Sequence, residues 1–236
     1  MMIKRIVFFV TVNLLMATVL QAQVMDATTL IQKVKANIDK VNDYEATGKM
    51  ITNVTFLKVP QADVKVYFRK PNKLKIKNEK GISFVPKSAV SINLNNILNG
   101  NKYSVLDAGK DRIGNTNVRV VKLLPEDDNA DVVLSTLYID EATMVILRAK
   151  TTTRENGSYQ LEMTYGKYVT YGLPDKIIFT FNTKDYKLPK GVTFDFDDGT
   201  QNNKTAADKA KSKTGSAEIT FSGYIVNKGV AEEMFK

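Results

Sequence analysis

The chain has 236 residues, with 34 Lys and Arg against 25 Asp and Glu, which gives a net charge of +9 at pH 7. It contains no His, Cys or Trp. These absences exclude Ser–His and Cys–His catalysis, zinc sites built from His or Cys, and disulfide bonds. Because catalysis would depend on Lys, Tyr or carboxylates alone, we expect a protein that is not an enzyme and needs no metal or cofactor.

The first 22 residues have the pattern of a secretory signal peptide. Lys4 and Arg5 precede a mostly apolar run at residues 6–20, and the sequence Leu-Gln-Ala at residues 20–22 is typical of a cleavage site. The alternative is an N-terminal membrane anchor, but the run has about 15 residues where a bilayer core needs about 20. We therefore predict a signal peptide at residues 1–22 and one mature domain at residues 23–236, exported to the periplasm as a monomer.

The excess of basic residues favours attraction to anionic lipid headgroups or acidic partners, although a solvated surface rich in Lys explains it equally well. Nucleic acid is not an expected partner, because the chain carries a signal for export and no clustered DNA- or RNA-binding motif.

Residues 26–41 are predicted to form an amphipathic helix. Apolar residues recur at helical spacing on one face, and Asp26 or Thr28 can cap the N-terminus. A single helix of this kind ahead of a run of strands is expected to lay its apolar face on the sheet. That face is formed by Leu30, Ile31, Val34, Ile38 and Val41.

The region after this helix alternates between strands and one short helix. Strands are predicted at residues 44–56, with Gly48 as a bulge, and at 64–69, 74–77 and 81–86. A short helix at residues 91–98 carries Ile92, Leu94, Ile97 and Leu98. Further strands are expected at 103–106 and 118–124, with turns at Gly109, Gly114, Asn115 and Asn117.

Residues 132–182 predict an antiparallel meander of four strands, separated by turns at residues 140–143, 154–157 and 171–174. The Asn-Gly pair at residues 156–157 is a strong hairpin signal, because both residues tolerate positive φ. Leu161 and Met163 alternate with polar residues, and so do Ile177 and Phe179. Period-two alternation places one set toward a core or cavity and the other toward water.

The acidic residues are expected mainly in turns. Residues 126–128 are interpreted as a solvated turn, and residues 195–199 resemble a calcium loop without the closing Glu. A strand at 192–196, a polar loop or irregular helix at 201–214, a last strand at 217–226 and a helical turn at 230–235 complete the chain.

These elements predict a mainly β (α+β) fold. Roughly ten strongly twisted antiparallel strands tend to curl. We expect an unclosed β-barrel, with the N-terminal helix and the short helix covering its concave face.

Three groups of motifs in this chain resemble the LolA-like periplasmic carriers of outer-membrane lipoproteins, and in particular the subgroup called outer-membrane lipoprotein-sorting proteins. The first is Y-F-R-K-P-N-K-L-K-I-K at residues 67–77. The second runs through Leu-Tyr-Ile-Asp at 137–140, Thr143, Arg148, Gly157, Tyr165 and Gly-Leu-Pro at 172–174, and the ending at residues 222–229 with Phe235 is also similar.

The resemblance implies an apolar cavity that takes the acyl chains of lipoproteins or other lipids, with partner proteins at the inner and outer membranes. In that family an Arg before the Pro latches a lid. Lys70 stands at this position and Arg69 precedes it, so both are latch candidates, although Lys lacks the planar fork of Arg. The candidates for lining the cavity are Phe68, Leu74, Ile76, Ile92, Leu94, Ile97, Leu98, Leu161 and Met163.

Two other functions stay open at this point. A periplasmic sensor or protein-interaction module could use the same fold without transporting lipid, and a filled barrel would favour it. A carboxylate-dependent hydrolase would need acids that converge in a cleft. For Leu74 and Ile76, a place in an ordinary packed core is as compatible with the pattern as a place in a cavity wall.

Overall fold

The structure is a computed structural model that describes residues 25–54, 57–58, 61–71, 73–78, 98, 102–154, 157–182 and 214–235. Its helical elements are the helix α2 (Ala27–Ile38) and the short 3₁₀ turns η1 (Val169–Tyr171) and η2 (Glu232–Phe235). The strands are β1 (Asp43–Val54), β2 (Leu57–Lys58), β3 (Ala62–Arg69), β4 (Lys73–Asn78), β5 (Tyr103–Ile113), β6 (Thr116–Pro125), β7 (Val132–Asp140), β8 (Val145–Thr153), β9 (Ser158–Thr164), β10 (Lys176–Asn182) and β11 (Thr214–Val226).

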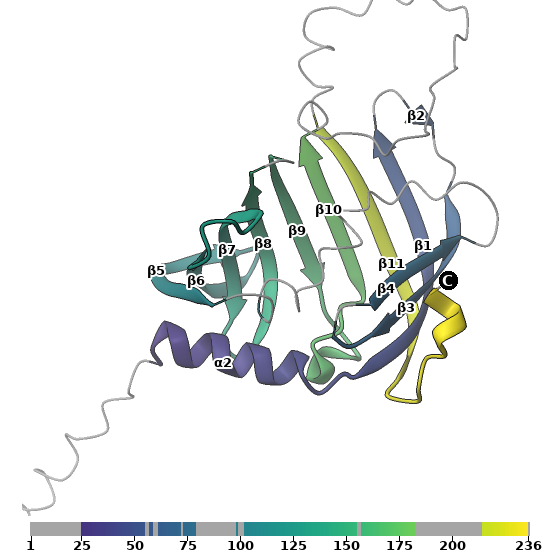
Figure 1. Ribbon diagram of the computed structural model, residues 1–236, viewed down its shortest axis with the longest axis horizontal. Coiled ribbons are helices and arrows are strands. Elements are labelled where there is room, and N and C mark those ends of the chain that lie inside the picture. Colours follow the sequence, from purple (N-terminus) through teal and green to yellow (C-terminus); the bar gives the residue numbers. More distant parts are fainter. Residues whose placement is uncertain are drawn as a thin grey trace, which may run out of the picture.

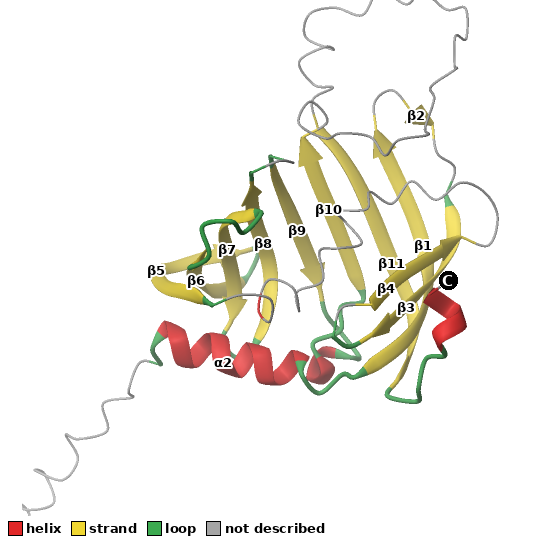
Figure 2. Cartoon of the chain, viewed as in Figure 1, coloured by secondary structure: helices red, strands yellow, loops and turns green. Residues whose placement is uncertain are grey.

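The strands form one antiparallel sheet in the order β4-β3-β1-β11-β10-β9-β8-β7-β6-β5, with β2 paired to β1. The sheet curves strongly, and β4 and β5 are its two edges among the described residues, so it does not close (Figure 1). The predicted mainly β, unclosed barrel is therefore confirmed. Chain order alone does not produce this arrangement, because β1 lies between β3 and the last strand, β11 (Figure 2).

The helix α2 begins where the sequence predicts and ends earlier. Asp26 caps it: its carboxylate accepts hydrogen bonds from Thr29 N at 2.9 Å and Thr29 Oγ1 at 2.5 Å. The predicted end at Val41 is wrong, because the helix stops at Ile38 and a turn leads into β1. Val41 is nevertheless buried, and it packs against Phe68 rather than on the helical face.

The edge hairpin β5–β6 is longer than predicted. Gly114 and Asn115 form its turn, but Gly109 lies inside β5 at a shift of register and Asn117 lies inside β6. Gly109 has φ +87°. A glycine with positive φ is as useful in a β-bulge as in a turn, which is why the turn assigned to this position was wrong.

The bulge predicted at Gly48 is confirmed by the shift in register between Thr47 and Gly48 against β11. The two backbones approach closely at this point, since a Cβ on Gly48 would lie 2.6 Å from the carbonyl oxygen of Thr220. Only glycine fits here without displacing the backbone of the neighbouring strand.

The central meander is confirmed as β7, β8, β9 and β10. Its first turn is held by Asp140, whose carboxylate accepts a hydrogen bond from Ala142 N at 2.9 Å. The connection between β9 and β10 is longer than a simple turn and includes η1. It ends near β11, where Phe221 N donates to the carbonyl oxygen of Asp175 at 2.8 Å.

The concave face of the sheet has two parts. In the helix-covered half, formed by β5 to β8, the apolar face of α2 packs against fully buried strand residues, and Figure 1 shows α2 running along that end of the sheet. The cavity half is formed by β9, β10, β11, β1, β3 and β4. The fully buried residues of the helix-covered half include Leu30 and Val34 of α2, with Val121, Leu137, Ile139 and Ala149 opposite them.

Within the described part of the chain, no helix is long and apolar enough to cross a membrane. The described acidic residues do not gather into a group of three that could hold a metal ion.

Candidate functional site

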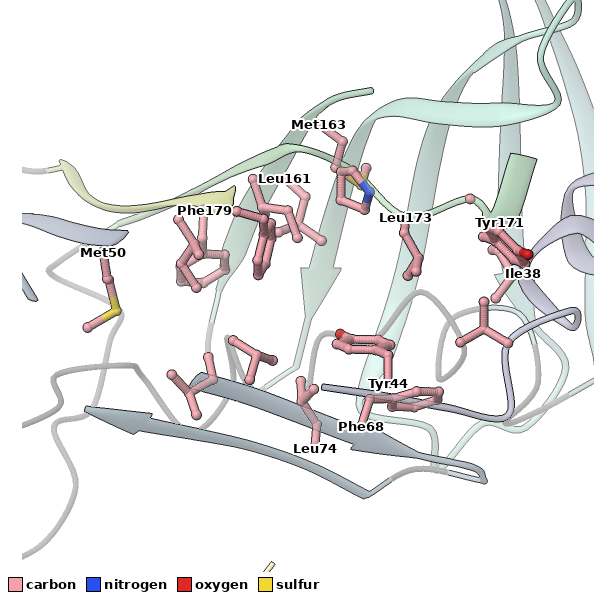
Figure 3. Close-up of a pocket in the computed structure, with 18 of the residues that line it drawn as sticks. Ile38, Tyr44, Met50, Phe68, Leu74, Leu161, Met163, Tyr171, Leu173 and Phe179 are labelled. Carbon is pink, nitrogen blue, oxygen red and sulfur yellow. The ribbon is translucent and has the colours of Figure 1, made fainter. Parts of the chain in front are cut away.

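The cavity half lines a partly open cavity of about 140 Å³. Its wall carries no charged side chain among the described residues. Because the sheet curves, side chains on its concave face meet across this space. Figure 3 shows Tyr44, Phe68 and Leu74 on one side, with Leu161, Met163 and Phe179 opposite them and Leu173 from the loop after η1. The lining residues are Ile38, Val41, Tyr44, Met50, Val66, Phe68, Leu74, Ile76, Leu161, Met163, Tyr171, Gly172, Leu173, Pro174, Ile177, Phe179, Ala217, Ile219 and Phe221.

Side chains along each strand point alternately to the two faces of the sheet, and this alternation brings the apolar ones into the wall. Phe68 of β3 stands opposite Leu74 of β4, and Val66 stands opposite Ile76, so these four side chains form one apolar surface. The residues between them project from the other face of the sheet, where the ammonium group of Lys77 lies 5.6 Å from the ring centre of Tyr67. The strand β4, which is rich in Lys, therefore presents apolar side chains only on the face toward the cavity.

Five of the predicted lining residues lie in the cavity wall: Phe68, Leu74, Ile76, Leu161 and Met163. Leu98 is 3% exposed and packs in the same core cluster as the apolar face of α2, and it is not among the residues of the wall. Ile92, Leu94 and Ile97 lie outside the described residues, so the lid predicted at residues 91–98 stays a prediction. Whether the wall binds a ligand is likewise still a prediction.

Sequence reasoning missed part of the wall. Tyr44 begins an inward-facing row in β1 that continues through Ala46 and Met50, so alternation could have found it. Leu173 and Pro174 come from an irregular loop, and no periodic pattern marks them. They reach the wall because Leu173 N donates to the carbonyl oxygen of Tyr168 and the loop folds back over the sheet.

Lys70 joins the turn between β3 and β4 to the end of α2. Its ammonium group donates to the carbonyl oxygen of Asp39 at 2.7 Å and lies 3.3 Å from the carboxylate of the same residue. Lys35 also donates to this carboxylate at 2.6 Å. Partial burial by itself raises the pKa of Asp39, but the hydrogen bonds from Lys35 and Lys70 outweigh it and lower the pKa below the ordinary value.

Arg69, the second latch candidate, holds a different element. Its guanidinium donates to the carbonyl oxygen of Val230 at 3.0 Å, pairs with Glu232 and lies 5.3 Å from the ring centre of Phe235. Lys73 pairs with the same Glu232 at 2.5 Å. Arg69 thus attaches η2 to the sheet, and of the two candidates Lys70 is the one that contacts the helix.

The acidic turn at residues 126–128 is exposed, and Asp127 accepts a hydrogen bond from Asn129 N at 2.9 Å, as expected for a solvated turn. Several other predictions fall outside the described residues: the signal peptide, the strands at 81–86 and 192–196, the acidic loop at 195–199, and residues 201–213.

No protein-family model matches this sequence, and the comparison with curated proteins found no match either. Solved structures do match. An outer membrane lipoprotein-sorting protein domain from Vibrio parahaemolyticus is 13% identical, with a TM-score of 0.57, over 89% of this chain and 96% of that one.

Two further solved structures show the same likeness. A DUF1329 family protein from Desulfovibrio piger has a TM-score of 0.55 at 12% identity, over 89% of this chain and 97% of that one. A LolA superfamily protein from Nitrosomonas europaea has a TM-score of 0.53 at 9% identity, over 90% and 98%. The chain therefore has a LolA-like fold.

Proposed function

We propose that this protein is a periplasmic carrier that binds the acyl chains of lipoproteins or other lipids in the cavity and helps to sort them to the outer membrane. The observation that carries the proposal is the cavity, which is apolar on both sides and has no charged residue in its described wall. The LolA-like fold is consistent with it. Exchange with donor and acceptor proteins at the two membranes belongs to the same proposal.

The physical basis is the transfer of methylene groups out of water. Each buried CH₂ contributes about 0.8 kcal/mol, so an apolar cavity holds an acyl chain without specific polar contacts. Engineered apolar cavities of about 150 Å³ stay dry and take up benzene. A space of about 140 Å³ is of the same size. It accommodates a short apolar segment, and a longer acyl chain requires the walls to separate.

The first test is direct. The protein lacking residues 1–22 is purified, and lipids that accompany it are extracted and identified by mass spectrometry. Acylated lipids in stoichiometric amounts are the expected result. Protein free of lipid that also fails to bind an apolar fluorescent dye such as phenylnaphthylamine would contradict the proposal and favour an interaction module.

The second test places a charge in the wall. Leu74→Glu and Ile76→Glu should abolish dye binding, because an unpaired carboxylate in an apolar cavity is strongly disfavoured. Lys75→Glu is the matched control, since it introduces the same group into the same strand on the opposite face. Circular dichroism checks that each variant remains folded. Unfolded glutamate variants would assign Leu74 and Ile76 to a packed core, and undiminished binding would remove them from the site.

A further inference from the structure

Three tyrosines near the cavity differ in what their hydroxyl groups bind. Tyr224 Oη donates to the carbonyl oxygen of Pro174 at 2.6 Å, and Tyr165 Oη donates to that of Ile146 at 3.0 Å. Tyr44 Oη has no hydrogen-bond partner among the described residues. Tyr44 is partly buried and lines the cavity, so its hydroxyl is open to the cavity rather than sealed in the core. Its hydrogen is therefore available to a molecule that enters the cavity.

The ring of Tyr44 is held in place by its neighbours. Its centre lies 5.3 Å from that of Phe68 and 5.4 Å from that of Tyr224, with the Tyr224 ring at 75° in an edge-to-face arrangement. Tyr44 lines the cavity, and Figure 3 shows its hydroxyl directed toward the middle of the lining side chains. The Tyr44 hydroxyl is thus a polar group held in a fixed position within an apolar wall.

The protonation state makes this group a donor. Burial raises the pKa of Tyr44 above its ordinary value of 10.0, because the phenolate would lose its hydration. At neutral pH the side chain is an uncharged hydroxyl that offers one hydrogen. A pure hydrocarbon packed against this hydroxyl would shut it off from water and leave it unpaired, at a cost of about 1–3 kcal/mol. A ligand that accepts the hydrogen avoids this cost.

The surroundings indicate which acceptor fits. The described wall contains no Lys or Arg to neutralise a carboxylate, so a free fatty-acid headgroup placed beside Tyr44 would be a buried charge without a counter-ion. An ester or amide carbonyl accepts the same hydrogen bond without a charge. This chemistry selects acyl chains that are esterified or amide-linked over free fatty acids.

We propose that Tyr44 is a specificity-determining residue whose hydroxyl donates a hydrogen bond to the ester or amide carbonyl of an acyl chain in the cavity. This proposal rests on the proposed function, since it assigns the chemical class of the ligand to the same cavity. It makes the cavity selective for acylated molecules, because a ligand that covers the donor without accepting its hydrogen leaves the hydroxyl unpaired.

The test compares ligands that differ only in the acceptor. Binding of methyl decanoate, decanoate and undecane is measured by displacement of phenylnaphthylamine from the wild-type protein and from Tyr44→Phe. We expect Tyr44→Phe to bind methyl decanoate about three- to tenfold more weakly than the wild type does, from the typical value of one hydrogen bond. The affinity of Tyr44→Phe for undecane should not fall below that of the wild type.

Tyr224→Phe is the matched control, because its hydroxyl is already bonded to Pro174 and its ring packs against Tyr44. This variant should bind methyl decanoate as tightly as the wild type does. As a second measurement, the infrared carbonyl stretch of bound methyl decanoate labelled with carbon-13 should lie at a lower wavenumber in the wild type than in Tyr44→Phe.

The outcomes separate the two proposals. A wild-type protein that binds neither ester nor alkane overturns the proposed function and this inference with it. A Tyr44→Phe variant whose affinity for the ester and whose carbonyl frequency match those of the wild type overturns the role of Tyr44 and leaves the carrier function intact. Tighter binding of decanoate than of the ester would overturn the selection against free acids.

Discussion

The two halves of the concave face have the same alternating strand pattern, but one half is a packed core and the other lines a cavity. In the helix-covered half, Leu137, Ile139 and Val121 are 0% exposed because α2 supplies apolar side chains opposite them. In the cavity half, Leu74 and Ile76 are only partly buried and face an open space. The difference shows that alternation decides which way a side chain points, whereas the element opposite decides whether it becomes core or cavity wall.

Residues at the boundary between the two halves contribute both to the packed core and to the cavity wall. Leu161, Met163 and Phe179 pack in the core cluster and also line the cavity, and Ile38 at the end of α2 does the same from the helix. The cavity thus begins where α2 ends. Lys70 contacts Asp39 at this point, so the end of the helix is attached to the strands on the far side of the cavity.

The largest expected effect is the loss of core packing in the helix-covered half. Leu30→Ala removes a fully buried side chain of α2 and should lower the free energy of unfolding by about 2–5 kcal/mol. Leu74→Ala in the cavity wall should cost about 1 kcal/mol, because its side chain loses less burial. Urea unfolding measures both. Equal losses would mean that the cavity half is packed as tightly as the core.

A second pair of variants adds volume instead of removing it. Ala149→Leu should destabilise the protein by about 1–3 kcal/mol, because the helix-covered half has no space for the larger side chain. Ala217→Leu places the same group beside the cavity, so it should leave stability nearly unchanged and weaken the binding of phenylnaphthylamine. Thermal unfolding and dye titration are the measurements. Strong destabilisation by Ala217→Leu would contradict the presence of free space.

The smallest expected effect concerns the boundary at Asp39. Its pKa lies below the ordinary value of 3.8 in the folded protein, so its ionised form stabilises the fold above that pH. The contribution is lost as the pH falls below 3.8 through the folded-state pKa. Asp39 and its partners Lys35 and Lys70 are partly exposed. Asp39→Asn should therefore lower the free energy of unfolding by less than about 1 kcal/mol at neutral pH.

Urea unfolding of Asp39→Asn and wild type, from about pH 7 down to about pH 3, measures this contribution. The two proteins should differ at neutral pH and converge in acid. Lys35→Gln, which removes one of the two cations, should reproduce part of the difference at neutral pH. A gap between Asp39→Asn and wild type that does not narrow in acid would show that the ion pair is not its source.

Much of the architecture could be predicted from local patterns. The alternation in residues 159–163 and 177–181 identified the strands β9 and β10 and their inward faces, and the spacing of Leu30, Ile31 and Val34 identified the buried face of α2. These predictions succeed because the side-chain period of a strand or helix is a local property of the backbone. The same reasoning marked Leu74 and Ile76 as inward-facing.

Three features were decided by tertiary structure alone. The pairing of β1 with both β3 and β11 joins distant parts of the chain and creates the second wall of the cavity. The end of α2 at Ile38 decides which inward-facing residues this helix does not cover. The hydroxyl of Tyr44 has no hydrogen-bond partner among the described residues, whereas that of Tyr224 donates to the carbonyl of Pro174, fifty positions away in the chain. Sequence periodicity specifies the direction of a side chain, but its partners depend on distances between segments that only folding brings together.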